Sequence, residues 1–227
     1  MARVITDLDD AIEMINTLYE GDSTPPSSGE EDYEVWMALL NAAINIWEYE
    51  EGMLWDELYT KLSDNSTGGD TTTTAGDYSY NCPTAFRFPA SGYVWLGTGT
   101  NKTAFKVIKP QDLQLYENDT SNWCYFLTDG SPTLEFNPNC QIPDGYTINY
   151  SYYKHATALT TGASTFEMAD PMFAVYYALS ELKKEEGDTT ALSIAQQKLE
   201  GMKTKNMMPS WYQDINLRPI NDGGFGI

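Results

Sequence analysis

The stretch FEMADPMFAVYYALSELKKEEGD, residues 166–188, has the pattern of a helix with both ends marked. Asp170 can accept a hydrogen bond from the first turn, and Pro171 stands where a missing backbone N–H is harmless. Gly187 follows a lysine-bearing last turn and is a C-cap candidate. One apolar stripe recurs at helical spacing, at Met172, Val175, Leu179 and Leu182. The stretch predicts a helix that needs packing partners.

A second helix is predicted directly after the first. Asp188 can cap it, and Pro209 ends it. Its apolar positions also recur at helical spacing, at Leu192, Ala195, Leu199 and Met202. The two segments together predict a helical hairpin.

The N-terminal part of the chain predicts two further helices, separated by the breaker segment 21–29. Ser27 and Glu30 offer a capping box to the second of them, which runs to about Glu50. Residues 55–62 predict a further helical turn or two. The apolar stripes are Leu8, Ile12, Ile15 and Tyr19 in the first helix, and Trp36, Leu40, Ala43 and Trp47 in the second, widened by Val35, Leu39 and Ile46.

Between these two pairs of helices the apolar period changes from about 3.6 to 2. Residues 63–77 are rich in Thr, Gly, Asp and Ser and predict a flexible loop. Seven β-prone runs follow: TAFRFP (84–89), YVWLG (93–97), AFKVIK (104–109), LQLYE (113–117), WCYFL (123–127), TLEF (133–136) and YTINYSYYK (146–154). Short strands with tight turns predict an antiparallel sandwich or small barrel.

The predicted fold class is therefore α+β, with a four-helix bundle core, an inserted antiparallel β-domain and an extended C-terminal arm. Two helices before the strands and two after them are more economically one bundle than two. The predicted parts are N-terminal bundle helices (1–62), a flexible loop (63–77), the β insert (78–165), a helical hairpin that completes the bundle (166–208) and the C-terminal arm (209–227).

The charge of the chain is strongly negative and uneven. The formal net charge is −20, and residues 1–60 hold fifteen acids against one base, Arg3. Lys and Arg supply the affinity for a phosphate backbone, so a protein that grips nucleic acid is excluded. No run approaches the ~20 apolar residues of a membrane span. The N-terminus MARVITDLDD lacks an apolar signal core, which indicates a protein that is not exported.

Catalytic and metal-binding patterns are largely missing from the sequence. His155 is the single histidine, so the common triads and zinc sites lack parts. The spacing of Cys82, Cys124 and Cys140 indicates reduced, partly buried thiols. The GTGT run (97–100) lacks the third glycine of a phosphate-binding loop. We therefore predict neither an enzyme nor a cofactor or metal site.

The order of segments resembles the head-to-tail adaptor proteins of tailed bacteriophages. The resemblance is carried by the C-terminal half, in which a strand ends at Pro138 and the pattern P-x-G-x-T-I-x-Y-x-Y covers 143–152. A loop with Leu159 follows, then the helix entered by Pro171. The front half fits through LLNAAINIW (39–47) and through the Thr/Gly-rich loop before TAFRFP, whereas YSYNCP (78–83) departs from the family pattern.

The resemblance implies a structural ring subunit, commonly in twelve copies, that docks under the portal and lines the DNA channel. Its expected partners are other copies, the portal protein and a tail or nozzle protein, and genome DNA passes through without specific binding. The expected location is the virion connector, with host cytoplasm during assembly. Candidate channel-lining acids are Glu30, Glu31, Asp32, Glu48, Glu50 and Glu51. Candidate partner-binding residues of the arm are Trp211, Tyr212, Leu217, Ile220 and Phe225.

Two other classes of protein remain open at this point. The sixteen Tyr and six Trp residues also suit an aromatic-rich β binding module of a phage tail or capsid-decoration protein that recognises host glycan. The abundant carboxylates leave a glycoside hydrolase as a third alternative. The oligomeric state separates the first two classes, since the adaptor forms a ring and the binding module does not need one.

Overall fold

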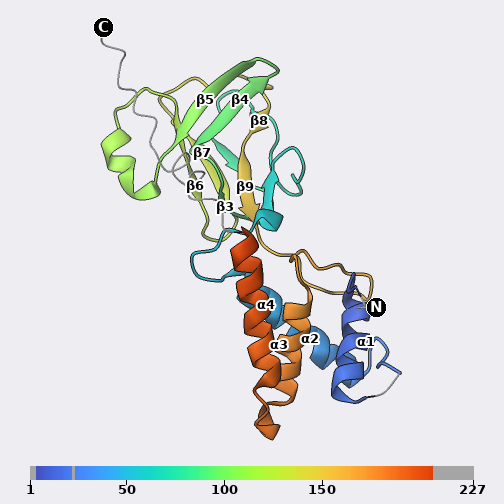
Figure 1. Cartoon of the computed structure of the whole chain (residues 1–227). Coiled ribbons are helices and arrows are strands. Elements are labelled where there is room, and N and C mark those ends of the chain that lie inside the picture. The colour runs from blue at the N-terminus through green and yellow to red at the C-terminus, as the bar shows by residue number, and fades with distance from the viewer. Residues whose placement is uncertain (1–3, 22–23, 207–227) are drawn as a thin grey trace. The chain divides into compact units, whose positions relative to one another are not determined.

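The computed structural model describes residues 4–21 and 24–206 (Figure 1). The chain divides into two compact units, one from residues 1–53 and 158–227 and the other from residues 54–157. We call them the helical unit and the β unit. Each unit is described by itself.

Four α-helices form the described part of the helical unit. They are α1 (Leu8–Tyr19), α2 (Glu31–Glu48), α3 (Met172–Leu182) and α4 (Thr190–Asn206). Asp7 caps α1, because its Oδ1 accepts a hydrogen bond from the Asp10 backbone N–H at 3.0 Å. The stripes predicted for the first two helices are largely confirmed: Leu8, Ile12 and Ile15 are buried in α1, and Trp36, Leu40, Ala43 and Trp47 in α2.

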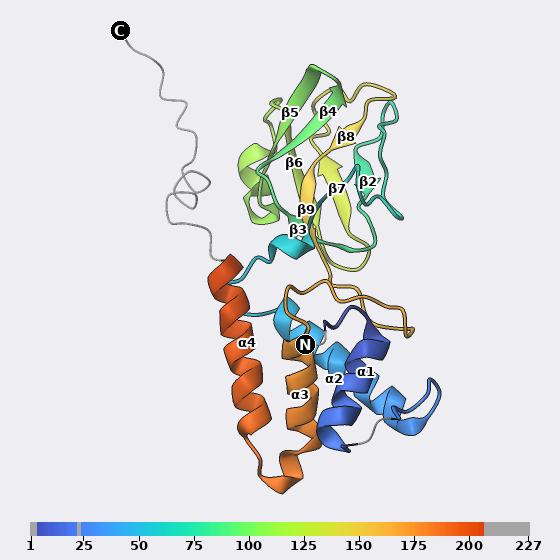
Figure 2. The ribbon, with the colours of Figure 1, turned by 45° about the vertical axis from the view of Figure 1, so that its right-hand side comes forward.

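Helix α3 is the central helix of this unit, because it packs against α4, α2 and α1. Figure 2 shows α3 between α4 and α2. The short 3₁₀ helix η3 (Lys184–Glu186) joins α3 to α4, and Gly187 follows it at φ 73°, a left-handed conformation that suits glycine. Buried residues cover most of the helix surface: Phe173, Ala174, Val175, Ala178 and Leu179. The predicted hairpin of the two C-terminal helices is therefore present.

The return segment, residues 158–165, brings the chain into the helical unit before α3. Its carbonyls accept hydrogen bonds from the start of α1: Leu8 N–H donates to Ser164 O at 2.9 Å and Asp9 N–H to Gly162 O at 3.1 Å. Free N–H groups of a first helical turn need such acceptors or caps. The return segment thus satisfies backbone donors of α1.

Strands in the β unit form two sheets. Their bounds are β1 (Tyr59–Lys61), β2 (Ser79–Asn81), β3 (Phe86–Pro89), β4 (Tyr93–Thr98), β5 (Asn101–Val107), β6 (Trp123–Leu127), β7 (Thr133–Phe136), β8 (Ile148–Asn149) and β9 (Ser151–Lys154). The larger sheet has the order β2-β7-β6-β5-β4-β8, and the smaller has the order β1-β9-β3. The six-stranded sheet is curled into a half-barrel.

The β unit has a hydrophobic core of its own. It gathers inward-facing residues from both sheets, among them Val94, Phe105, Phe126, Leu134 and Tyr152. The Phe86 ring stacks on the Phe126 ring at a centroid distance of 5.1 Å. The unit is therefore stabilised by its own packing, as a domain-sized core requires.

The predicted fold class, a four-helix bundle core with an inserted antiparallel sandwich or barrel, is wrong. The chain is α+β with two sheets, and its helices do not form a four-helix bundle core. Helix α4 packs along α3 and buries three residues, Ala191, Ala195 and Met202. One narrow buried row, Ala191, Ala195 and Met202, packs α4 mainly against α3 rather than around a shared bundle axis.

Two local predictions also fail in the β unit. Residues 55–62, predicted as helical, give a short 3₁₀ helix η1 (Asp56–Leu58) followed by β1, because Tyr59 to Lys61 pair with β9. Residues 113–117, predicted as a strand, lie in and just after the 3₁₀ helix η2 (Pro110–Tyr116). Through η2 the chain crosses over, so that β5 and β6 are parallel. The prediction that all strands of the insert are antiparallel is therefore wrong.

Candidate assembly surfaces

Three of the six candidate channel-lining acids lie at the start of α2. Glu30, Glu31 and Asp32 are all exposed. Glu30 Oε2 accepts a hydrogen bond from the Ser27 backbone N–H at 2.7 Å, which is one half of the capping box that the sequence predicts. Acids here complement the positive end of the helix dipole. All three carboxylates are therefore available on the surface of the helical unit.

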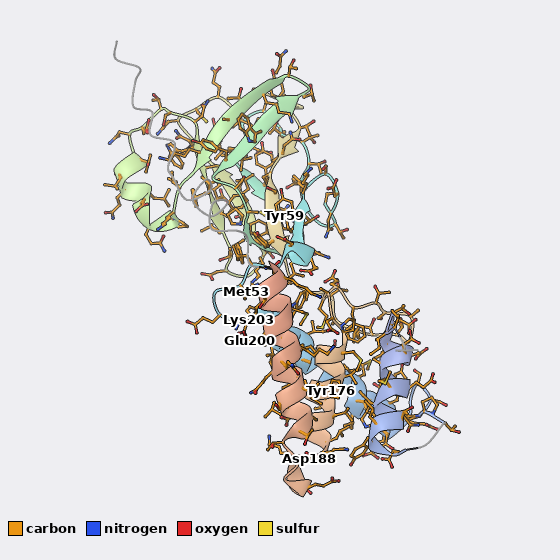
Figure 3. The ribbon with its side chains drawn as sticks, in the orientation of Figure 1. Met53, Tyr59, Tyr176, Asp188, Glu200 and Lys203 are labelled. Carbon is orange, nitrogen blue, oxygen red and sulfur yellow. The ribbon has the colours of Figure 1, made fainter. Side chains whose placement is uncertain are left out.

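The other three candidate acids lie at and just after the end of α2, in different environments. Glu48 is buried, with 3% of its surface exposed. Glu50 Oε1 lies 2.8 Å from Lys203 Nζ on α4, and Lys203 also pairs with Glu200 Oε1 at 2.8 Å. Hydrogen bonds to Glu200 and Glu50 raise the pKa of Lys203. Figure 3 labels Lys203 and Glu200 on α4. Glu51 is exposed, so it is the one of these three that a channel could use without rearrangement.

Helix α2 carries a second apolar stripe on its solvent side, which we call the outer stripe. It consists of Val35, Leu39, Ala42, Ile46 and Tyr49, which recur at helical spacing. Val35 is 44% exposed, Ile46 39% and Tyr49 57%. The sequence predicts that Val35, Leu39 and Ile46 widen the apolar face of α2 so that it packs on more than one neighbour, and within one chain Val35 and Ile46 are exposed while Trp36, Leu40 and Trp47 fill the inner face. The outer stripe is thus an apolar surface that is exposed at Val35, Ile46 and Tyr49 and half-buried at Leu39 and Ala42.

The candidate partner-binding residues of the predicted C-terminal arm lie outside the described residues; they are Trp211, Tyr212, Leu217, Ile220 and Phe225. They remain a prediction from the sequence.

The three cysteines are buried in the β unit, whereas the single histidine is exposed. Cys82, Cys124 and Cys140 are free and buried, as predicted. Burial raises the pKa of Cys82 to about 12, which keeps its thiol protonated at neutral pH. His155 is exposed directly after β9. Within residues 4–21 and 24–206, no three His, Cys, Asp or Glu side chains gather in a way that could hold a metal ion.

The β unit bears an open groove of about 520 Å³, which the sequence reading did not find. Its lining includes Trp123 and Tyr125 of β6, Glu135 of β7 and Glu117 after η2. The alternation of Trp123 and Tyr125 along one strand was the available signal, because residues i and i+2 share one face of a sheet. We call this hollow the β6–β7 groove.

The region around GTGT is a hairpin rather than a phosphate-binding loop. Strands β4 and β5 pair through Thr98 and Asn101, with two residues between them. Gly97 has φ 125°, and an added Cβ there would collide with the Asn101 carbonyl oxygen. Glycine at 97 is therefore required by the turn itself.

In the described ranges 4–21 and 24–206, no helix combines the length and the apolar character that a membrane crossing requires. The described residues form an α+β protein with a helical unit and a curled β unit. Its candidate functional features are the exposed acids and the outer stripe of the helical unit, and the β6–β7 groove of the β unit. The chain belongs to the SU10 adaptor protein family, whose model matches residues 3–217. This confirms the resemblance to phage head-to-tail adaptors, and the family is one of structural phage proteins associated with the virion. No curated protein matches the chain.

Proposed function

We propose that the chain is a subunit of a head-to-tail adaptor ring that lies between the portal and the tail. The observation that carries the proposal is the family match over residues 3–217, which spans both units of the fold. In this role the helical unit supplies contacts between copies, and acids on its surface line the channel. Assembly takes place in the host cytoplasm before the ring becomes part of the virion.

The outer stripe of α2 is the surface we assign to the neighbouring copy. Its apolar side chains lie in the most acidic part of the chain, where charged surface would otherwise keep copies apart. Burying such a stripe against a neighbour removes apolar area from water and favours association. A heterologous contact of this kind generates a closed ring when the rotation between copies closes. We expect about twelve copies, which is the number the resemblance implies.

Channel lining is assigned to the exposed acids at the two ends of α2, namely Glu30, Glu31, Asp32 and Glu51. A ring of twelve copies would carry twelve times the −20 formal charge of one chain. Carboxylates facing the lumen would repel DNA phosphates, but only within a Debye length of about 8 Å at physiological salt. The genome would then pass through without adhering to the wall.

The portal contact is assigned to the arm, residues 209–227. It carries large apolar residues in a Pro- and Gly-punctuated sequence, a composition typical of segments that fold on a partner. The tail or nozzle protein is the proposed partner on the other side of the ring.

Imaging of the assembled particle tests the proposal. We expect a ring of this chain at the vertex that joins head and tail, with α2 at the contact between copies. Density for the chain in the capsid lattice or in receptor-binding fibres would overturn it.

A further inference from the structure

The rims of the β6–β7 groove are fastened to each other. The fully buried Asn137 donates from Nδ2 to the carbonyls of Asp119 and Ser121, both at 2.8 Å. Asn139 Nδ2 donates to the Glu117 carbonyl at 3.2 Å. These bonds join the segment after η2 to the segment after β7. These side-chain hydrogen bonds therefore fix the two segments that border the groove relative to each other.

The floor of the groove is aromatic. Trp123 and Tyr125 lie on one face of β6, with ring centroids 6.3 Å apart. The Tyr116 ring, which does not line the groove, packs at 6.0 Å from the Trp123 ring. Indole and phenol faces carry partial negative charge and attract cations.

Two carboxylates stand beside this floor, and no Lys, Arg or His is among the residues that line the groove. Glu135 is paired in register with Tyr125 on one side and Ser79 on the other. Its Oε1 accepts hydrogen bonds from Ser79 Oγ at 2.6 Å and Thr133 Oγ1 at 2.8 Å, which fixes the carboxylate. Among the described residues, no hydrogen bond to Oε2 is present, so this oxygen remains available to a ligand. Glu117 adds a second, exposed carboxylate.

Trp123 also carries a polar group without a partner. The residue is 4% exposed, and its buried indole N–H has no hydrogen-bond acceptor in the described structure. Buried donors are nearly always paired, so each exception calls for an explanation. The N–H is covered in the unbound chain, so a carbonyl oxygen of a bound segment becomes its acceptor only when the indole turns toward the groove.

From this combination we infer that the β6–β7 groove binds an extended peptide segment of another protein that presents an arginine or lysine side chain. The cation lies beside the Tyr125 ring and pairs with Glu135 and Glu117, and a backbone carbonyl of the segment accepts from the Trp123 indole once that ring turns toward the groove. Phosphate-bearing partners, such as nucleic acid or anionic lipid, would meet two carboxylates and be repelled. The inference rests on the proposed assembly role for the source of the segment, but not on ring formation.

The experiment uses two peptides, Gly-Gly-Arg-Gly-Gly and the same peptide with citrulline in place of arginine. Each carries an uncharged coumarin dye, and binding to the full chain is followed by fluorescence anisotropy. Citrulline has nearly the shape of arginine without its charge. We expect the arginine peptide to bind more tightly, and its affinity to fall as salt rises from about 0.05 to 0.5 M.

Four variants locate the site. Glu135→Gln keeps an oxygen for Ser79 and Thr133, and we expect it to weaken arginine-peptide binding roughly three- to tenfold. Trp123→Phe keeps an aromatic ring but removes the indole donor, and should weaken both peptides. Glu117→Gln should weaken the arginine peptide alone. The matched control is Asp129→Asn, which removes one exposed carboxylate between β6 and β7, outside the groove, and should change affinity less than twofold.

Other outcomes overturn the inference. Equal affinity for the two peptides, or equal effects of Glu135→Gln and Asp129→Asn, would show that no cation is recognised in the groove. Binding of a neutral oligosaccharide such as maltoheptaose, lost in Trp123→Phe while the arginine peptide does not bind, would make the groove a glycan site. The sedimentation of each variant is measured in parallel. Loss of peptide binding with intact rings would overturn this inference alone, whereas a chain that forms no rings would count against the proposed function.

Discussion

Asn41 on α2 holds the main chain of Leu159 at two points. Its Nδ2 donates to the Leu159 carbonyl at 3.0 Å, and the Leu159 N–H donates to Asn41 Oδ1 at 2.8 Å. The two residues are 118 positions apart in the sequence. The Asn41 amide thus pairs with a backbone N–H and C=O in the way that a neighbouring strand does, and it fixes the return segment. The return segment in turn accepts hydrogen bonds from the first N–H groups of α1.

Asn41→Ala should destabilise the helical unit by about 1–3 kcal/mol, because it leaves a partly buried N–H and C=O without partners. Urea denaturation followed by far-UV circular dichroism measures the effect. Asn45→Ala is the control, since Asn45 is an exposed residue of the same helix and should change stability by less than about 0.5 kcal/mol. Equal losses in the two variants would contradict the role given to the Asn41 clamp.

The outer stripe is predicted to act between copies and not within one chain. Val35→Glu combined with Ile46→Glu should abolish ring formation and leave the denaturation midpoint nearly unchanged, because both side chains are already exposed. Sedimentation velocity reports the assembly state. A control with Asn45→Glu and Gln196→Glu adds the same charge at exposed positions outside the stripe. If this control disrupts rings equally, total charge rather than the stripe governs assembly.

The channel assignment predicts a response to charge reversal. Rings with Glu31→Lys and Asp32→Lys should retain DNA in a salt-sensitive manner, because bases in the lumen would exchange counterions with phosphates. Gel retardation of linear DNA measures this. Glu185→Lys with Glu186→Lys reverses two exposed acids of η3 as a matched control. Retention by both rings, or by neither, would show that the start of α2 does not face the channel.

Tyr33 should make the helical unit sensitive to alkaline pH. Its hydroxyl donates to Asp9 Oδ1 at 2.9 Å, and burial, together with this bond, raises its pKa to about 12. In the unfolded chain the phenol ionises near pH 10. Between about pH 10 and 12 the unfolded state therefore binds fewer protons than the folded state. The free energy of unfolding falls by about 1.4 kcal/mol for each pH unit in this range because of Tyr33.

Comparison of wild type with Tyr33→Phe isolates that effect. At pH 8 the wild type should be the more stable, because phenylalanine leaves Asp9 without the hydroxyl donor. The difference should shrink at pH 10.5, since phenylalanine does not titrate. A stability difference that stays constant or grows between these two pH values would show that Tyr33 ionises equally in both states.

The helices could be predicted well from the sequence, because their signals are local. The predicted acceptor Asp170 does bond the first turn of α3, through the Met172 N–H at 3.2 Å, and the periodic inner residues of α1 and α2 show which side of each helix is buried. How the helices are arranged is not local. The small buried residues Ala191 and Ala195 let α4 pack closely against α3. The helical period of a segment does not show which other helices it packs against, so the sequence pattern did not reveal that a four-helix bundle core is not formed.

The β unit was harder to predict for the same physical reason. Residues 59–61 carry a helical pattern but form a strand, because pairing with β9 outweighs local preference. Residues 113–117 alternate like a strand but lie where η2 crosses over. Strand pairing depends on partners distant in the sequence, which a pattern within one segment does not contain.

The channel-lining role of the six candidate acids stays a prediction, but their environments differ. Carboxylates at 30–32 are exposed, whereas Glu48 is buried and Glu50 forms an ion pair with Lys203. Neither burial nor ion pairing across 153 positions can be read from spacing. The outer stripe is visible in the sequence, because Tyr49 continues the helical spacing of Val35 and Ile46. Recognising it requires the assumption that α2 has two separate apolar faces.

Native mass spectrometry of the purified full chain, alone and after mixing with portal rings, tests the central proposal most directly. The account predicts that a subunit of 25.5 kDa assembles into a closed species of about twelve copies that binds the portal ring. A chain that stays at 25.5 kDa at every concentration and does not associate with the portal would contradict it.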